Sequence, residues 1–312
     1  MIEVKECSKA FGTVKAVNKA TLDVGVREVF GLVGSNGAGK STLLRMMAGI
    51  IKPDEGEIQI DGMPVYENEE AKKLFFYISD DSYFPANYTA MDLVRFYRNF
   101  YPQFRTRLFH ELMEQFHLEE NRRIATFSKG MKKQVLVIIG VCAATKYLFC
   151  DETFDGLDPV MRQAVKSLFA AEIMNREFTP VIASHNLREL EDICDQLALL
   201  HKGGLVLESD IENLKTSQFK IQIAFRGEYD KSKFQGIQVS HYEKSGSVAN
   251  LIVSGDREEI VQKLRAMEPI LLDVLPLSLE EVFTYEMETL GYTFQIDDLI
   301  EEENRHAESK SK

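Results

Sequence analysis

The sequence has few cysteines, no long apolar run and no net positive charge. Its four cysteines in 312 residues show neither metal-type nor disulfide-framework spacing, so we expect reduced thiols in the core. They are Cys7, Cys142, Cys150 and Cys194. No stretch approaches the roughly 18 uninterrupted apolar residues of a membrane span, and residues 1–6 lack the start of a signal peptide. These absences favour a globular, cytoplasmic protein.

The formal net charge is −12 at pH 7, which further limits the class of partner. A surface that binds nucleic-acid phosphates needs a basic stripe, so the acidic balance argues against a nucleic-acid partner. Much of the excess lies at the end of the chain, where residues 286–312 hold eight acids, one arginine and two lysines. The rest of the chain is only mildly acidic.

The sequence does contain a glycine-rich loop between a predicted strand and a predicted helix. The apolar segment 28–33 predicts a buried parallel strand, and residues 41–49 favour a helix that stops at Gly49. The loop and the first turn of the helix comprise Gly34, Ser35, Asn36, Gly37, Ala38, Gly39, Lys40, Ser41 and Thr42. In this context the pattern predicts a site for nucleotide phosphates, with Lys40 near the β- and γ-phosphates and Ser41 as a Mg²⁺ ligand.

A second predicted strand ends in two carboxylates. Residues 146–150 are mostly apolar and lead directly into Asp151 and Glu152. At the carboxyl edge of a sheet, Asp151 is the candidate Mg²⁺ ligand and Glu152 the candidate general base that orients the attacking water. Two acids alone equally suit the start of a solvated loop, but together with the phosphate loop they predict an ATP-hydrolysing site.

Strand-like and helix-like segments alternate over residues 1–210, which predicts an α/β domain. Helical signals interrupt this pattern at about 85–144, where Thr89-Ala90-Met91-Asp92 resembles a capping box, and they indicate an inserted helical subdomain. Aromatic residues there, including Phe96 and Phe100, are expected in the core, with reception of a partner as the alternative.

The pattern changes after residue 210. Apolar and polar residues alternate at 219–225, and Ser278-Leu279-Glu280-Glu281 is typical of a second capping box. We therefore expect a small α+β accessory domain at 211–290. The remaining residues, 291–312, are expected to form an acidic, flexible tail.

A further motif lies just ahead of an apolar helix and comprises Ser128, Lys129, Gly130 and Met131. It resembles the signature motif of ATP-binding cassette (ABC) ATPases, in the variant with lysine replacing the first glycine. Other segments match in the family's order: Phe11 for an aromatic that stacks on adenine, Asp158 in a D-loop, and His185 for the switch histidine. The resemblance covers residues 1–208 and implies a P-loop NTPase core with an inserted helical subdomain.

The resemblance also implies a second ABC ATPase subunit. In the family, two domains face head to tail and bury two ATP molecules, each between the phosphate loop of one domain and the signature of the other. Ser128 and Gly130 would then contact the γ-phosphate bound to the partner, and Asp158 would link the two sites. His185 would hold the γ-phosphate and the water in place.

Two positions depart from the family pattern. Where the family usually has a glutamine in the loop joining the core to the helical subdomain, this chain has Asp80, with Asp81 as the alternative. A carboxylate would still face Mg²⁺, but its charge near the γ-phosphate would alter the coupling of nucleotide to the subdomain. The usual proline after the acidic pair is replaced by Thr153-Phe154.

The signature lysine and the small C-terminal domain resemble the ATPases of bacterial antibiotic, bacteriocin or multidrug exporters. The resemblance implies a Mg-ATP hydrolase, paired as a homodimer or heterodimer, that powers a separate permease at the inner face of the membrane. The alternatives are a non-transport ABC ATPase acting on ribosomes or DNA, and a low-turnover ATP sensor. Translation-factor types carry two cassettes in one chain, which this chain does not. The presence of Glu152 and His185 favours hydrolysis over sensing.

Overall fold

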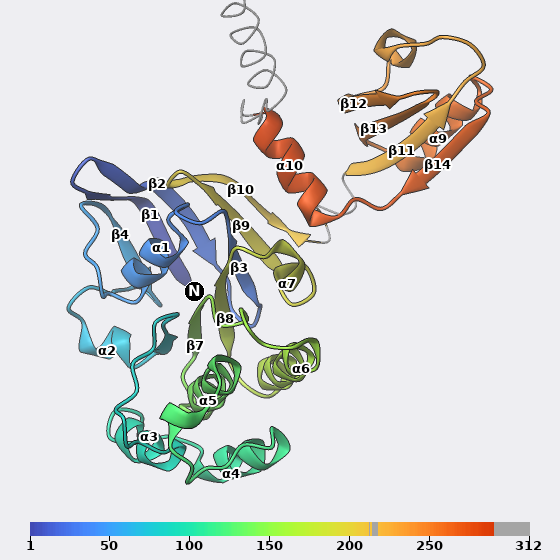
Figure 1. The fold of residues 1–312 in the computed structure, drawn as a ribbon. Coiled ribbons are helices and arrows are strands. Elements are labelled where there is room, and N and C mark those ends of the chain that lie inside the picture. Colours follow the sequence, from blue (N-terminus) through green and yellow to red (C-terminus); the bar gives the residue numbers. More distant parts are fainter. Residues whose placement is uncertain (212, 214–217, 290–312) are drawn as a thin grey trace, which may run out of the picture. The chain divides into compact units, whose positions relative to one another are not determined.

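Figure 1 shows a computed structural model of the chain, which describes residues 1–211, 213 and 218–289. The chain divides into two units, Met1–Glu212 and Asn213–Lys312. The tail expected at 291–312 lies outside the described residues. None of the helices in the described ranges is long and apolar enough to cross a bilayer.

The first unit is built around a six-stranded sheet with the order β10-β9-β3-β8-β7-β6. Its strands are β3 (Phe30–Val33), β6 (Phe75–Ile78), β7 (Tyr147–Asp151), β8 (Thr179–Ser184), β9 (Gln196–His201) and β10 (Gly204–Asp210). All of them run parallel except β10, which pairs antiparallel with β9. Every residue of β3, β7 and β8 is buried, as expected for a parallel sheet covered on both faces.

A second, antiparallel sheet packs onto the same core in the order β2-β1-β4-β5. Its strands are β1 (Ile2–Phe11), β2 (Val14–Val24), β4 (Glu55–Ile60) and β5 (Met63–Pro64). Helix α1 (Lys40–Met47) contributes Leu43, Leu44 and Met46 to this core, so the apolar face of the helix fixes the phosphate loop that precedes it.

The remaining helices of the first unit are α2 (Glu69–Lys72), α3 (Ala90–Tyr97), α4 (Thr106–Gln115), η1 (Ile124–Thr126), α5 (Lys129–Cys142), α6 (Pro159–Asn175) and α7 (Leu187–Glu191). Helix α3 begins with the predicted capping box: the Thr89 hydroxyl accepts from the Asp92 N–H, and the Asp92 carboxylate accepts from the Thr89 N–H. Of the aromatics expected in the core, Phe116 is buried, whereas Phe96 and Phe100 are 47% and 58% exposed. Because α3 ends at Tyr97, Phe100 lies beyond its packed face.

The second unit contains a four-stranded antiparallel sheet with the order β12-β13-β11-β14. Its elements are β11 (Gln218–Ala224), η2 (Lys231–Phe234), β12 (Val239–Ser245), β13 (Val248–Ser254), α9 (Arg257–Arg265), β14 (Leu271–Leu275) and α10 (Leu279–Thr289). The alternation in β11 buries Phe219, Ile221 and Ile223 in a core of its own. Helix α10 begins with the predicted capping box between Ser278 and Glu281.

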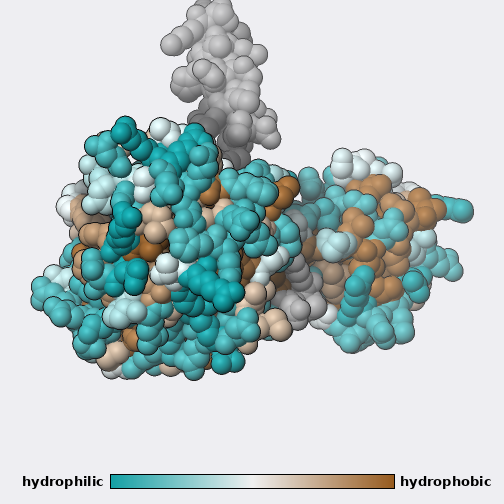
Figure 2. Space-filling view, turned by 90° about the horizontal axis from the view of Figure 1, so that it is seen from below, coloured by the Kyte–Doolittle hydropathy of each residue, from teal (hydrophilic) through white to brown (hydrophobic). Residues whose placement is uncertain are grey.

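The surface differs between the two units. On the face shown in Figure 2 the first unit is mainly hydrophilic, whereas hydrophobic residues gather on the second. All four cysteines are buried free thiols, which confirms the sequence prediction. Burial raises the pKa of Cys142 and Cys150 to about 12, so both remain protonated at neutral pH.

Candidate functional site

The glycine-rich loop joins β3 to α1 and closes tightly against β2. Gly39 has φ +105°, and a Cβ at this position would lie 2.2 Å from the backbone oxygen of Ala16. Only glycine fits the backbone at this position, so the close approach of the loop to β2 requires it. The loop therefore brings backbone N–H groups and the start of α1 to one place, an arrangement suited to anions.

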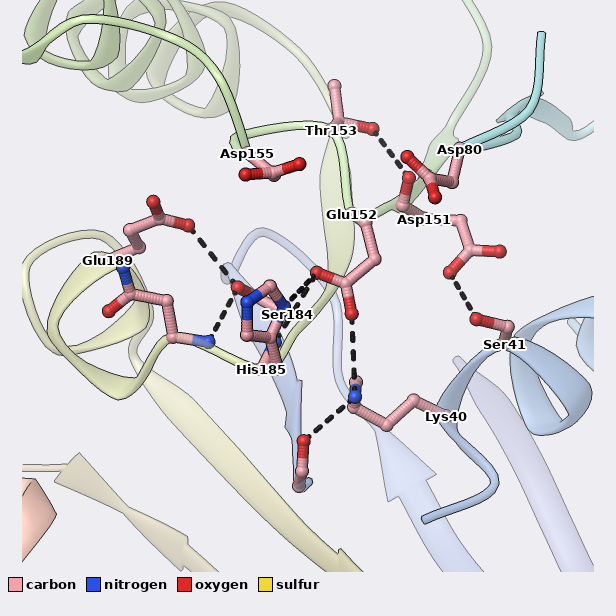
Figure 3. A network of polar contacts seen from close by, with 12 residues as sticks. Lys40, Ser41, Asp80, Asp151, Glu152, Thr153, Asp155, Ser184, His185 and Glu189 are labelled. Atoms are coloured by element: carbon pink, nitrogen blue, oxygen red, sulfur yellow. Dashed lines mark hydrogen bonds and ion pairs between the residues drawn. The ribbon is translucent and has the colours of Figure 1, made fainter. Parts of the chain in front are cut away.

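Lys40 opens α1 and is 4% exposed. Its ammonium donates to the carbonyl oxygens of Gly34 at 2.8 Å and Ser35 at 3.3 Å. It also lies 3.4 Å from Oε1 of Glu152. Figure 3 shows the two side chains pointing toward each other. Because a buried ammonium needs anionic or carbonyl partners, Lys40 is held with its charge directed at the place where phosphate would bind.

Asp151, at the end of β7, is completely buried. Its carboxylate accepts hydrogen bonds from the Ser41 hydroxyl at 2.7 Å and the Tyr77 hydroxyl at 3.1 Å, and the Arg45 guanidinium lies 3.9 Å away. Burial raises the pKa of Asp151, and the hydrogen bonds from Ser41 and Tyr77 oppose this shift. Burial also raises the pKa of Tyr77 to about 12, which keeps its hydroxyl a donor.

Glu152 and His185 follow adjacent parallel strands. Asp151 pairs with Ala183 between β7 and β8, and the Glu152 N–H donates to the Ala183 carbonyl at 2.9 Å. The Glu152 carboxylate lies 2.8 Å from Nδ1 of His185. Glu152 itself has φ +47°, a left-handed backbone that is unfavourable for glutamate and frequent at functional sites. The ends of β7 and β8 thus place the Glu152 carboxylate beside the His185 imidazole (Figure 3).

The turn after His185 is fixed by a small polar network. The Ser184 hydroxyl donates to the Glu189 carboxylate at 3.2 Å and accepts from the Asn186 N–H at 3.0 Å. The Asn186 side chain caps α7 by accepting from the Arg188 N–H. These bonds restrict the backbone on both sides of the imidazole.

A cavity of about 520 Å³ opens over the loop. It is lined by Val14, Ala16, Asn36, Gly37, Ala38, Gly39, Lys40, Ser41, Thr42, Asp80, Glu152, Asp155 and His185. Phe11 is not among these residues: it is 52% exposed, with the ammonium of Lys9 5.8 Å from its ring centroid. Val14 and Ala16, which the sequence patterns did not single out, line the cavity.

The signature residues do not line the cavity of their own chain. Ser128 caps α5 by accepting from the Met131 N–H at 3.2 Å, and Lys129 pairs with Asp155 at 2.9 Å. Asp158 caps α6 in the same way and is exposed. Both caps leave a helix N-terminus accessible at the surface.

Two residues that sequence reasoning missed contact the predicted ones. Tyr77 binds Asp151, and the ammonium of Lys133 lies 3.2 Å from Oδ1 of Asp80. The sequence offers one signal for Lys133. A lysine this close to the apolar run of α5 is expected to be buried, and a buried cation needs an acidic partner. Asp80 is the candidate for this partner, because the family usually has a glutamine, and not an acid, at its position.

The oxygen ligands present fit a magnesium ion. Among the described residues there is no group of at least three His, Cys, Asp or Glu side chains that would hold a metal by themselves. Magnesium in nucleotide sites instead uses one or two protein oxygens together with phosphates and water. The adjacent Ser41 hydroxyl and Asp151 carboxylate supply that chemistry.

The parallel sheet, the glycine loop before α1 and the acidic strand end define a P-loop nucleotide-binding protein. The chain matches the family model described as ABC transporter over residues 17–155. It is 31% identical to the ABC transporter ATP-binding protein YtrB of Bacillus subtilis (strain 168), over 91% of this chain and 97% of the relative. The chain therefore belongs to the ATP-binding subunits of ABC transporters.

Two further comparisons agree with this assignment. The chain is 29% identical to the bacitracin transport ATP-binding protein BcrA of Bacillus licheniformis, over 69% of this chain and 71% of that protein. The fold also matches a dimeric ATP-binding cassette solved in a post-hydrolysis state with ADP and Pi. The TM-score is 0.61 at 20% identity, covering 68% of this chain and 99% of the other. The predicted α/β P-loop fold is thus confirmed.

Proposed function

We propose that this subunit hydrolyses Mg-ATP and that the energy drives a separate membrane permease for export. The observation that carries the hydrolytic part is the position of the Glu152 carboxylate, 3.4 Å from the Lys40 ammonium and 2.8 Å from the His185 imidazole. A base next to a phosphate-binding lysine suits activation of a water for phosphoryl transfer.

In the proposed reaction, backbone N–H groups of the loop and Lys40 bind the β- and γ-phosphates. The Glu152 carboxylate orients a water in line with the γ-phosphate and accepts its proton as the new P–O bond forms. The bond from the γ-phosphorus to the bridging β-phosphate oxygen breaks, and ADP leaves with phosphate as the second product. His185 holds the carboxylate and the γ-phosphate in register. The ammonium of Lys40 exchanges its contact with Glu152 for one with phosphate, which frees the carboxylate for the water.

We propose that Ser41 and Asp151 hold Mg²⁺ at this site, with Asp80 facing it from the loop after β6. When bound, the ion neutralises charge that develops on the phosphate oxygens. Asp151 is suited to this role because Ser41 and Tyr77 already fix both of its oxygens. Two fixed oxygens limit the reorganisation needed on binding.

We propose that a second subunit, another copy of this chain or a related ATPase, completes the site. Ser128, Lys129, Gly130 and Met131 would cover the nucleotide bound to the partner, and Asp158 would connect the two sites. This is supported by the surface position of the signature helix terminus and by the dimeric state of the matched cassette. An exposed helix N-terminus with a small hydroxyl and a glycine suits close approach to a phosphate.

The proposed permease would dock on the helical part of the first unit and hold the chain at the cytoplasmic face of the membrane. A groove of about 630 Å³ is lined there by exposed aromatic and basic residues, including Phe96, Phe100 and Lys73. Exposed aromatics in a groove are typical of partner-binding surfaces. Export is supported by the signature lysine, the small C-terminal unit and the likeness to a bacitracin transport subunit.

Release of phosphate from Mg-ATP by the purified chain tests the hydrolytic part. We expect turnover that requires Mg²⁺ and falls at least about a hundredfold in Lys40→Ala, because the lysine contributes to both binding and charge stabilisation. Lys52→Ala, on the surface beyond α1, is the matched control and should leave turnover unchanged. Nucleotide binding without phosphate release from the unaltered chain would refute hydrolysis.

Isolation of the tagged chain from its own membranes tests the transport part. Recovery of a polytopic membrane protein in fixed proportion supports the permease, and Phe96→Ser with Phe100→Ser should release it without loss of ATP turnover. Substrate accumulating inside cells that lack the chain would support export. Co-sedimentation with ribosomes instead would contradict the transporter.

A further inference from the structure

Lys133 is a buried cation in the second turn of α5, only five residues beyond Ser128. Its side chain is 6% exposed, yet it bears a full charge close to the phosphate cavity. Its ammonium lies 3.2 Å from Oδ1 of Asp80 and 3.9 Å from Oδ2 of Asp155, and it donates to the backbone carbonyl of Glu152. An ammonium has three donors, and three oxygens surround this one.

These oxygens belong to three different segments of the first unit. Asp80 lies in the loop after β6, Glu152 follows β7, and Asp155 lies in the turn before α6. Lys133 itself is on the helix that begins with the signature. One side chain therefore connects the loop that joins the core to the helical part, the candidate base and the signature helix.

The charges around the cavity explain why such a residue is needed. The carboxylates of Asp80, Glu152 and Asp155 all line the space that would receive anionic phosphates. Repulsion between these groups and a triphosphate would oppose binding, and Lys40 already pairs with Glu152. Lys133, which does not itself line the cavity, offsets the charge of Asp80. Together with Lys129 it offsets that of Asp155.

The contact with Glu152 has a second effect. Glu152 has an unfavourable left-handed backbone, and its N–H is held by Ala183 on one side. The ammonium of Lys133 binds the carbonyl on the other side of the same residue. Both ends of the residue are thus fixed, which sets the direction of its carboxylate.

We propose that Lys133 is a positioning residue for ATP turnover, which neutralises Asp80 beside the phosphates and aims Glu152 through its carbonyl. Asp80 and Lys133 form a charge pair in which the lysine offsets the charge that the acid places beside the phosphates. The inference about turnover rests on the proposed function. The inference about charge concerns nucleotide binding alone and is tested separately from hydrolysis.

Equilibrium binding of the non-hydrolysable analogue AMP-PNP in the presence of EDTA, which removes any contribution of Asp80 to Mg²⁺ binding, tests the charge pair. Lys133→Gln should weaken binding roughly tenfold, because Asp80 is left unpaired beside the phosphates. Adding Asp80→Asn should restore the affinity to within about twofold of the unaltered chain, since both charges are then absent. Turnover should stay low in the double variant, because Glu152 has lost its carbonyl partner. Lys133→Arg keeps the charge and should retain the affinity.

Lys132→Gln is the matched control, since it makes the same change one residue earlier on α5. Lys132 is half-buried and makes no ion pair with the residues that the structure describes, so both affinity and turnover should be unchanged. A double variant that binds as weakly as Lys133→Gln would overturn the charge pair, as would normal binding by Lys133→Gln. Should Lys133→Gln fail to fold, Asp80→Asn alone decides: binding weaker than that of the unaltered chain contradicts the proposal. If the unaltered chain binds AMP-PNP but never releases phosphate from Mg-ATP, hydrolysis is contradicted. The binding measurements on the variants still decide the charge pair in that case.

Discussion

The phosphate loop and the signature segment differ in how far each is connected to the rest of its own chain. Lys40 and Ser41 contact Glu152 and Asp151 directly, across more than a hundred residues of sequence. Ser128, in contrast, accepts from its own helix and lies outside the cavity, and the signature reaches a cavity residue only through the ion pair of Lys129 with Asp155. One chain thus preassembles the phosphate site and presents the signature at its surface, which is the arrangement expected when the signature serves a second chain.

The largest effect should come from a substitution in the phosphate site, whose residues contact one another within one chain. In Glu152→Gln we expect turnover to fall by about 10²–10⁴, because the amide cannot accept the proton of the attacking water. ATP should still bind, since Gln keeps the size of the side chain. Steady-state phosphate release and nucleotide binding measure the two effects. Glu111→Gln on α4 is the control, and normal hydrolysis by Glu152→Gln would refute its role as base.

A smaller effect should follow from a substitution in the signature segment alone. The Cβ of Gly130→Ala would lie 2.8 Å from the Gly156 carbonyl oxygen, so the signature helix must shift. We expect roughly tenfold slower turnover with unchanged AMP-PNP binding by the isolated chain, because the phosphate loop is untouched. Gly204→Ala is the control, since the nearest atom to its Cβ is 3.6 Å away. An equal loss of nucleotide affinity would contradict the separation of the two regions.

Asp80 lines the cavity of the phosphate site and also contacts Lys133 on the signature helix, so it connects the two regions. Asp80→Ala should lower turnover several-fold with little loss of affinity, because removing a carboxylate beside the phosphates does not oppose their binding. The same substitution at Asp81 should have less effect, since Asp80 and not Asp81 lines the cavity. The ratio kcat/KM and the binding constant separate these effects. A larger loss in Asp81→Ala would move the role to that residue.

The smallest effect concerns Tyr77, which supports Asp151. Its hydroxyl donates to the carboxylate and so favours the ionised form, which opposes the upward pKa shift that burial causes. Tyr77→Phe should raise the pKa of Asp151 further, so the acid limb of the pH–rate profile should move to higher pH. Turnover on the alkaline plateau should change less than about threefold, because one neutral hydrogen bond is lost. Tyr66→Phe is the control, and an unshifted acid limb would contradict the assignment.

The strands that position the site follow from local patterns in the sequence. Apolar runs at 28–33 and 146–150 predict strands, and the residues that follow parallel strands meet at one sheet edge. This reasoning predicted that the phosphate loop and the acidic pair belong to one site, and the roles assigned to their residues stay predictions. It also anticipated the capping boxes, because each depends on residues only three positions apart.

The parts that sequence did not predict depend on contacts between distant segments. Tyr77 and Asp151 are 74 positions apart, and Asp80 and Lys133 are 53 apart. Neither pair has a spacing that a local rule recognises, because the fold alone brings the segments together. The exposure of Phe96 and Phe100 has the same origin, since periodicity identifies an apolar face but does not say what covers it.

The mass in solution of Glu152→Gln with Mg-ATP tests the central claim most directly, because the variant should hold ATP without consuming it. For a partner that is another copy of this chain, the account predicts a shift from the single mass of 35.6 kDa to twice that value when ATP is added. Adding Gly130→Ala to the same chain should weaken this shift while ATP binding persists. An ATP-saturated protein that remains at the single-chain mass would contradict completion of the site by a second copy.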